Sequence, residues 1–154
     1  MNWNRTGVIA LLIAVSVFSV AQQTTNEKPA PAPESTAFNV GDANAVLAQV
    51  REALEGHSPR KFLAIIAADK MGGYVSFRDQ MEAFYSRYDN IRVNIRSIQT
   101  SSDGDKGIIT ASFQMETTPR SGNVVRREDQ LRIELERTDK GWRIVELNPR
   151  SFFQ

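Results

Sequence analysis

The spacing of apolar residues changes near residue 91, and this change constrains the fold more than any other feature of the sequence. Before it, apolar residues recur every three or four positions, which is the period of a helix with one buried face. After it, apolar and polar residues alternate, which is typical of antiparallel strands with one packed face and one wet face. Helices followed by consecutive strands predict an α+β domain with its helices on one face of an antiparallel sheet.

Three helices are expected before the change. Asp42 is a suitable N-cap for the first, which ends at Gly56. Ser58 caps the second, and Pro59 takes its first helical position, where a missing N–H costs nothing. Ser76 caps the third, after a double glycine. This third helix carries a broad aromatic stripe formed by Phe77, Met81, Phe84, Tyr85 and Tyr88.

About four strands are expected after the change. Their alternating segments lie near residues 91–96, 107–118, 131–136 and 142–147. Short turns at residues 103–105 and 139–141 join the outer pairs, and a longer loop over residues 119–123 joins the middle pair. Strands joined in this way form a sheet of consecutive hairpins.

The N-terminal segment has the features of a secretory signal. Arg5 precedes an almost wholly apolar run over residues 8–18, and small residues at Ser19 and Ala21 form a cleavage site. A retained anchor is the alternative, but a spanning helix needs about 20 apolar residues. No Cys follows Ala21 to carry a lipid. We therefore expect residues 1–21 to be removed and the protein to be exported, either periplasmic or secreted, without a stable membrane anchor.

A proline-rich linker over residues 22–41 is expected to follow. Pro29, Pro31 and Pro33 alternate with small residues and favour an extended, semi-rigid spacer. The alternative is a docking motif for a partner. The remaining residues, 42–154, form the single expected domain.

Composition excludes several classes of site. The chain has no Cys, so it has neither disulfides nor thiolate metal sites, and its one His leaves no zinc ligand set. Loss of Arg5 with the signal leaves a neutral chain, with no bulk attraction to nucleic acid or to anionic membranes. No phosphate-binding or dinucleotide-binding glycine motif is present. We expect no metal and no cofactor.

Three segments carry a resemblance to a known family: FRDQMEAFYSRYDNIRV (77–93), GIITASFQMETT (107–118) and LRIELERTDKGWRIVEL (131–147). With the order of elements, they resemble nuclear transport factor 2-like (NTF2-like) domains, particularly the SnoaL-like and ketosteroid-isomerase-like members, over about residues 42–150. The resemblance implies a curved sheet that forms a cone-shaped pocket with the helices, and often a dimer through the outer sheet face. Its members include isomerases, dehydratases and cyclases, and others that only bind or scaffold.

No catalytic residue can be assigned from that resemblance. Isomerase-type members use a pocket carboxylate as base with a Tyr and a protonated acid as donors, and no segment here matches their motif closely. The pocket candidates are Tyr74, Tyr85, Tyr88, Asp79 and His57. The alternatives are that Tyr85 and Tyr88 are core residues, that Asp79 supports a helix cap and that His57 faces solvent in a turn.

Two further patterns bear on the surface and on the cone. Phe152 and Phe153 make the last residues unusually apolar, so they plug the cone or pack on a second subunit. Basic and acidic residues are interleaved along the last two strands, which predicts cross-strand ion pairs on a wet or subunit-facing surface. The basic members are Arg126, Arg127, Arg132, Arg137 and Arg143, and the acidic ones are Glu128, Asp129, Glu134, Glu136 and Glu146.

Taken together, these patterns favour a domain that acts by binding. The partner is either a small apolar molecule in the cone or a protein on the sheet, including a second copy of the chain. A small isomerase or dehydratase, using a pocket Asp or His with Tyr donors, is the alternative. A purely structural envelope protein held on the tether is the third possibility.

Overall fold

The computed structural model describes residues 37–154, so the expected signal segment and residues 22–36 of the linker lie outside the described residues. The helices come first: α1 (Val40–Glu55), α2 (Pro59–Ala64) and α3 (Tyr74–Arg87). Four strands follow: β1 (Tyr88–Asp103), β2 (Lys106–Pro119), β3 (Val125–Thr138) and β4 (Gly141–Asn148). A short 3-10 helix, η1 (Arg150–Phe153), completes the unit. The predicted α+β class is confirmed.

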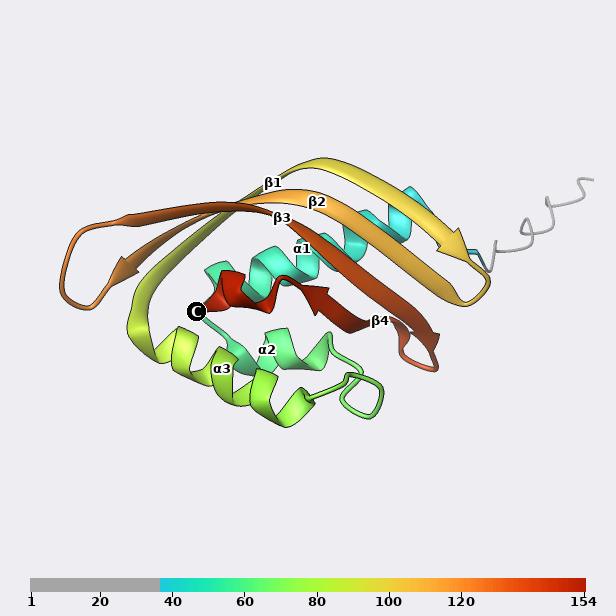
Figure 1. The fold of residues 1–154 in the computed structure, drawn as a ribbon, viewed down its shortest axis with the longest axis horizontal. Helices are drawn as coiled ribbons and strands as arrows, with labels where there is room; N and C mark the ends of the chain where they lie inside the picture. Colours follow the sequence, from blue (N-terminus) through green and yellow to red (C-terminus); the bar gives the residue numbers. More distant parts are fainter. Residues whose placement is uncertain (1–36) are drawn as a thin grey trace, which may run out of the picture. The chain divides into compact units, whose positions relative to one another are not determined.

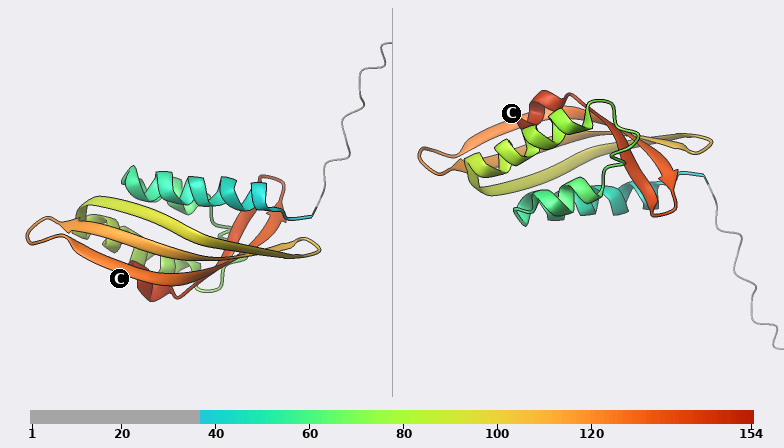
Figure 2. Two further views of the ribbon diagram at one scale, coloured as in Figure 1. Left: turned by 90° about the horizontal axis from the view of Figure 1, so that it is seen from above. Right: turned by 90° about the horizontal axis from the view of Figure 1, so that it is seen from below.

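The strands form one antiparallel sheet in the order β1-β2-β3-β4. In Figure 1 the first three strands arch over the helices and η1, and the β2–β3 hairpin extends beyond them. Helix α1 contacts both edge strands, β1 and β4, so it closes the open side of the curved sheet. Figure 2 shows η1 beside α3, and these two elements are in contact.

Two predicted helix caps are wrong. Helix α1 begins at Val40, and its N-cap is Asn39, whose Oδ1 accepts hydrogen bonds from the backbone N–H of Gly41 (2.7 Å) and Asp42 (3.1 Å). Asp42 instead accepts a hydrogen bond from the backbone N–H of Asn39 at 3.1 Å, as the third residue of a capping box. Asn39 was assigned to the linker, so its capping role was missed.

The start of α3 was also misplaced. The helix begins at Tyr74, and Ser76 lies inside its first turn rather than at its cap. Gly73 is the N-cap and makes no side-chain hydrogen bond. Its φ of 68° lies in the left-handed region, which glycine adopts at no steric cost. A glycine therefore starts this helix by its backbone conformation, where a capping side chain was expected.

Residues just before α1 belong to the folded unit, although the sequence places them in the linker. Phe38 is buried, and its ring packs edge-to-face on Trp142 with centroids 4.9 Å apart. It lies directly over Gly107 on β2: a Cβ at that glycine would stand 2.5 Å from the ring. Close packing of Phe38 therefore requires glycine at this point of the strand.

The core lies between the concave face of the sheet and the helices. From β2 and β3 the inward-facing residues are fully or almost fully buried: Ile109, Ala111, Phe113, Met115, Leu131, Ile133 and Leu135. The helices contribute the apolar faces expected from their spacing, including Leu54, Phe62, Phe77, Met81 and Phe84. No helix within residues 37–154 is long and apolar enough to cross a membrane.

Candidate functional site

The interior of the cone is occupied by the protein's own side chains. Phe153 of η1 lies among three helical phenylalanines, with ring centroids 5.8 Å from Phe62, 6.5 Å from Phe77 and 5.9 Å from Phe84. Phe152 packs against Phe113 of β2, with centroids 6.1 Å apart. Both η1 phenylalanines are buried. The expectation that they plug the cone is therefore the one that the structure supports, rather than packing on a second subunit.

Polar contacts hold this plug, defined as residues 149–154, in place. Gln80 Nε2 on α3 donates a hydrogen bond to the carbonyl of Arg150 at 2.6 Å. The Arg127 guanidinium on β3 donates to the carbonyls of Phe152, at 3.4 Å, and Gln154. These contacts tie η1 to α3 on one side and to the sheet on the other.

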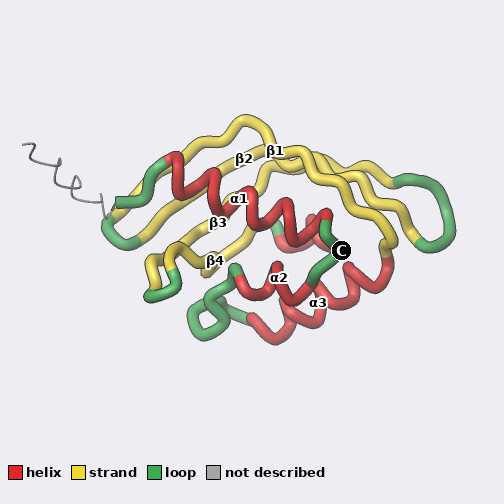
Figure 3. The backbone as a smooth tube through the Cα atoms, turned by 180° about the vertical axis from the view of Figure 1, so that it is seen from behind, coloured by secondary structure: helices red, strands yellow, loops and turns green. Residues whose placement is uncertain are grey.

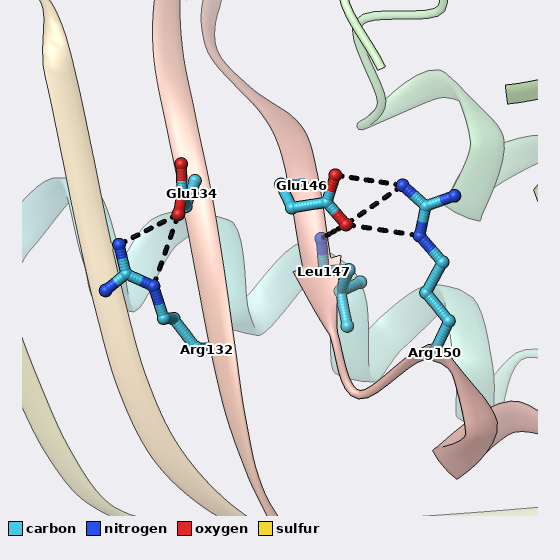
Figure 4. Close-up of polar contacts among 5 residues, drawn as sticks. All are labelled: Arg132, Glu134, Glu146, Leu147 and Arg150. Atoms are coloured by element: carbon cyan, nitrogen blue, oxygen red, sulfur yellow. Dashed lines mark hydrogen bonds and ion pairs between the residues drawn. The ribbon is translucent and has the colours of Figure 1, made fainter. Parts of the chain in front are cut away.

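A second set of contacts fixes the start of η1 (Figure 4). The Glu146 carboxylate on β4 accepts hydrogen bonds from Arg150 Nε at 3.2 Å and Nη2 at 2.9 Å. It also accepts one from the backbone N–H of Leu147 at 3.3 Å. The Arg150 guanidinium lies 5.5 Å from the centroid of the Phe77 ring. Arg150 therefore links β4, η1 and α3 through a charged pair and an aromatic face.

Of the five predicted pocket residues, Tyr85 and Tyr88 lie in the core. Tyr85 donates a hydrogen bond from its hydroxyl to the carbonyl of Ala53 at 3.1 Å. Burial raises the pKa of Tyr85 above its ordinary value, which keeps the phenol neutral. The Tyr88 hydroxyl accepts a hydrogen bond from Arg127 Nη2 at 3.0 Å. Both hydroxyls already have partners within the protein.

The other three candidates lie at the surface or the rim, Tyr74 and Asp79 on α3 and His57 in the turn after α1. Tyr74 begins α3 and packs half-buried against the core. Asp79 is exposed and pairs with its neighbour Arg78 at 2.8 Å, with no capping role. His57 is exposed in the turn after α1, where its ring meets that of Tyr85 edge-on, with centroids 5.4 Å apart. The structure does not gather the five predicted residues around one cavity.

The outer face of the sheet carries part of the predicted ion-pair pattern. Arg126 of β3 pairs with Glu116, its register partner on β2. Arg132 pairs with Glu134 on the same strand at 2.8 Å, so this pair lies along the strand rather than across it (Figure 4). Arg127 faces the plug and not an acidic neighbour. Arg126 and Glu116 therefore pair across strands as the spacing predicts, whereas Arg132 and Glu134 do not.

The clefts described on residues 37–154 lie on the outside of the domain. One, of about 720 Å³, lies between the loop after α2 and the β3–β4 turn. A second, of about 210 Å³, lies beside α1 and α2 and shares Ala64 and Arg143 with the first. Arg143 was predicted only as a member of an ion pair, so sequence reasoning missed this site. In the sequence, Arg143 alternates with the apolar residues Trp142 and Ile144. This pattern predicts a surface position on a strand and does not indicate a cleft.

No metal centre is evident within the described part of the chain. No group of three or more His, Asp or Glu side chains in residues 37–154 is placed to hold an ion. Inside the cone, the described residues offer a packed aromatic core and no open cavity. Outside it, they offer surface clefts with both charged and apolar lining residues.

Comparison with solved structures identifies the fold. A candidate aromatic ring hydroxylase from Novosphingobium aromaticivorans superposes with a TM-score of 0.65 at 14% identity, over 71% of this chain and 88% of that one. A candidate dehydratase of the NTF2-like family from Streptomyces avermitilis gives 0.64 at 12%, over 75% and 95%. An NTF2-like superfamily protein from Salmonella enterica gives 0.61 at 10%, over 70% and 86%.

These likenesses show that the domain has the NTF2-like fold, as the sequence resemblance implied. No protein-family model and no curated protein matches the sequence. At such low identities the likeness carries the fold and no activity.

Proposed function

We propose that this chain is an exported NTF2-like domain that acts by binding at its surface, without catalysis in the cone. The observation that carries the proposal is the plug: Phe152 and Phe153 occupy the space between α3 and the sheet that an internal ligand would need. Ligand sites are concave and largely pre-formed, whereas this interior is filled by aromatic side chains.

The filled cone favours a protein partner over a small apolar molecule. An apolar ligand inside the cone would have to displace Phe153 from its contacts with Phe62, Phe77 and Phe84. Removing an aromatic side chain from a packed core costs about 3–5 kcal/mol, so such a ligand starts from a large disadvantage. A partner on the outer surface meets no such cost.

The isomerase or dehydratase alternative lacks a site among the described residues. Such an enzyme needs a base whose pKa is perturbed, and this base must lie in a cavity beside hydroxyl donors. Asp79 and His57 are exposed, and the Tyr85 hydroxyl is already bonded to Ala53. We therefore place this alternative second.

The outer face of the sheet is the surface that we propose for a protein partner, including a second copy of the chain. It is polar, and Arg92 on β1 is an exposed cation with no carboxylate in ion-pair distance among residues 37–154. Glu128 on β3 is an exposed anion without a cation in such reach on the same residues. A two-fold contact could pair the two. Because loss of Arg5 with the signal leaves no net charge, we propose no nucleic-acid partner. Because we propose that the apolar run over residues 8–18 is removed with the signal, we propose no stable membrane anchor.

The proposal is tested by isolating the protein from the envelope of its native host, crosslinking it there and weighing it by native mass spectrometry. We expect an N-terminus at Gln22, a mass without a small-molecule adduct, and a crosslinked protein partner or a dimer. A reproducible adduct that is lost on denaturation, with no protein partner, would favour a ligand inside the cone. Recovery of the chain from the cytoplasm with residues 1–21 intact would contradict export.

A further inference from the structure

Arg143 of β4 is a half-buried cation at the meeting point of two clefts. It lines both the cleft of about 720 Å³ and the adjoining one of about 210 Å³. Among residues 37–154, no carboxylate lies within ion-pair distance of its guanidinium. A guanidinium presents a planar fork of donors that matches a carboxylate, so its donors are available to a ligand in the cleft.

Two carboxylates that neighbour Arg143 in the fold are paired with lysines instead. Glu136 is its direct register partner on β3, but Glu136 Oε2 lies 2.6 Å from Lys70 Nζ. Glu52 lines the second cleft, and its Oε1 lies 2.7 Å from Lys61 Nζ. The hydrogen bond to Glu136 raises the pKa of Lys70, and the one from Lys61 lowers the pKa of Glu52. Each of these two carboxylates therefore has a lysine as its ion-pair partner, and neither pairs with Arg143.

The floor of the larger cleft is apolar and anchored by backbone hydrogen bonds. Ala64, Ile66, Ala67 and Ala68 line it. The backbone N–H of Ala67 donates to the carbonyl of Ile144 at 2.9 Å, and that of Ile144 donates to the carbonyl of Ile65 at 2.9 Å. The loop is thereby fixed to β4 beside Arg143. In Figure 3 the loop after α2 and the β3–β4 turn lie at the same end of the domain.

The remaining charges limit which anions fit. Asp69 and Asp139 line the same cleft, together with Lys140 and with Lys70, whose charge is paired with Glu136. The carboxylates Asp69, Asp139 and Glu136 balance the cations Lys70, Lys140 and Arg143, so the cleft carries no excess positive charge for a phosphate or another polyanion. A ligand with one carboxylate and an apolar body finds complementary groups at both of its ends. Its carboxylate meets the Arg143 guanidinium, and its apolar body meets the alanines of the floor.

We propose that this cleft binds a monocarboxylate with a short apolar body, its carboxylate held by the Arg143 guanidinium and its body lying on the floor formed by residues 64–68. The inference goes beyond the proposed function, which assigns a protein partner to the outer face of the sheet and no ligand to this cleft. Either a small organic acid or the free carboxyl end of a peptide supplies this chemistry.

The test is a titration of the ¹⁵N-labelled protein with hexanoate, with hexanamide and with N-acetylleucine, followed by NMR. Hexanamide keeps the body and removes the charge, and N-acetylleucine represents a peptide carboxylate. We expect saturable shifts at Arg143 Nε and at the amides of Ala67 and Ala68 with at least one carboxylate. Binding should weaken about tenfold or more with hexanamide and in Arg143→Gln, because a hydrogen bond to a charged group is lost. Arg143→Lys keeps the charge without the fork and should bind with intermediate strength.

Arg60→Gln is the matched control, because Arg60 is exposed on α2 and lines neither cleft. It should bind as the wild type does, and whichever carboxylate binds more tightly distinguishes the two sources. Equal binding of hexanamide and hexanoate, unchanged binding in Arg143→Gln and Arg143→Lys, or no saturable shift with either carboxylate would each overturn the inference. None of these outcomes touches the filled cone, so they leave the proposed surface binding to its own test.

Discussion

At the scale of single residues, the contact between Phe38 and Gly107 decides where the folded unit starts. We expect Gly107→Ala to destabilise the domain by about 1–3 kcal/mol, as overpacking does, because its Cβ would stand 2.5 Å from the Phe38 ring. Urea unfolding measures the change. Gly72→Ala is the control, since a Cβ at Gly72 meets nothing within 4 Å. Equal stability of the two variants would show that Phe38 does not pack there.

Tyr85 provides a residue-scale prediction that depends on pH. Tyr85→Phe should cost about 1 kcal/mol at neutral pH, since it removes the hydrogen bond to Ala53. Burial raises the pKa of Tyr85 in the folded state, so the unfolded chain ionises first, near pH 10. The stabilisation is therefore complete below about pH 10 and is lost as pH rises through the folded-state pKa.

Urea unfolding of wild type and Tyr85→Phe at neutral pH and at about pH 11 checks this sign. The advantage of the wild type should shrink at the higher pH. An advantage that stays constant or grows would show that the Tyr85 phenol is not protected from ionisation.

The role of a single residue could be predicted where neighbouring positions in the sequence determine it, and not where distant residues do. The core roles of Tyr85 and Tyr88 follow from helical spacing, and both residues are buried. The α1 cap was misjudged because Asn39 lies in a segment whose composition indicates a linker, and the α3 cap because Gly73 starts that helix by its backbone conformation. Arg143 was missed because its isolation depends on lysines far away in the sequence, Lys61 and Lys70.

At the scale of elements, η1 fills the space that a ligand would occupy in an open cone. We expect Phe153→Ala to destabilise the domain by about 3–5 kcal/mol, since it leaves a cavity among three phenylalanine rings. Thermal or urea unfolding measures the loss. Val75→Ala is the control on α3, because Val75 is 60% exposed and should change stability little. A similar small change for both variants would show that η1 is not packed in the core.

Strand β1 shows the limit of periodicity as a signal. Alternation predicts only residues 91–96, whereas β1 runs to Asp103. The pairing with β2 shifts register between Arg96 and Gln99, where Ser97 has a φ of 51°. Beyond that bulge most side chains are exposed on both faces, so no apolar repeat marks the strand. The order and type of the elements were predicted correctly, because the buried halves of the strands carry the repeat.

At the scale of the whole molecule, the proposed dimer places the outer sheet face in a contact. Ser112 lies on that face, between the inward-facing Ala111 and Phe113, with Arg96 and Gln130 as its register partners. We expect Ser112→Arg to lower the dimer fraction measured by light scattering without lowering the unfolding temperature, because the added bulk and charge disrupt a close contact. The same substitution would leave the mass unchanged if copies meet elsewhere or do not meet.

The central claim is that the cone is closed by the protein's own aromatic side chains, so that binding takes place outside it. Titration of benzene, which matches the ring removed in Phe153→Ala, into wild type and Phe153→Ala, followed by NMR, tests this claim most directly. The account predicts no saturable binding to wild type and binding to Phe153→Ala, whose vacated space serves as the positive control. Stoichiometric binding to wild type, accompanied by release of Phe152 and Phe153 from their contacts in the core, would contradict it.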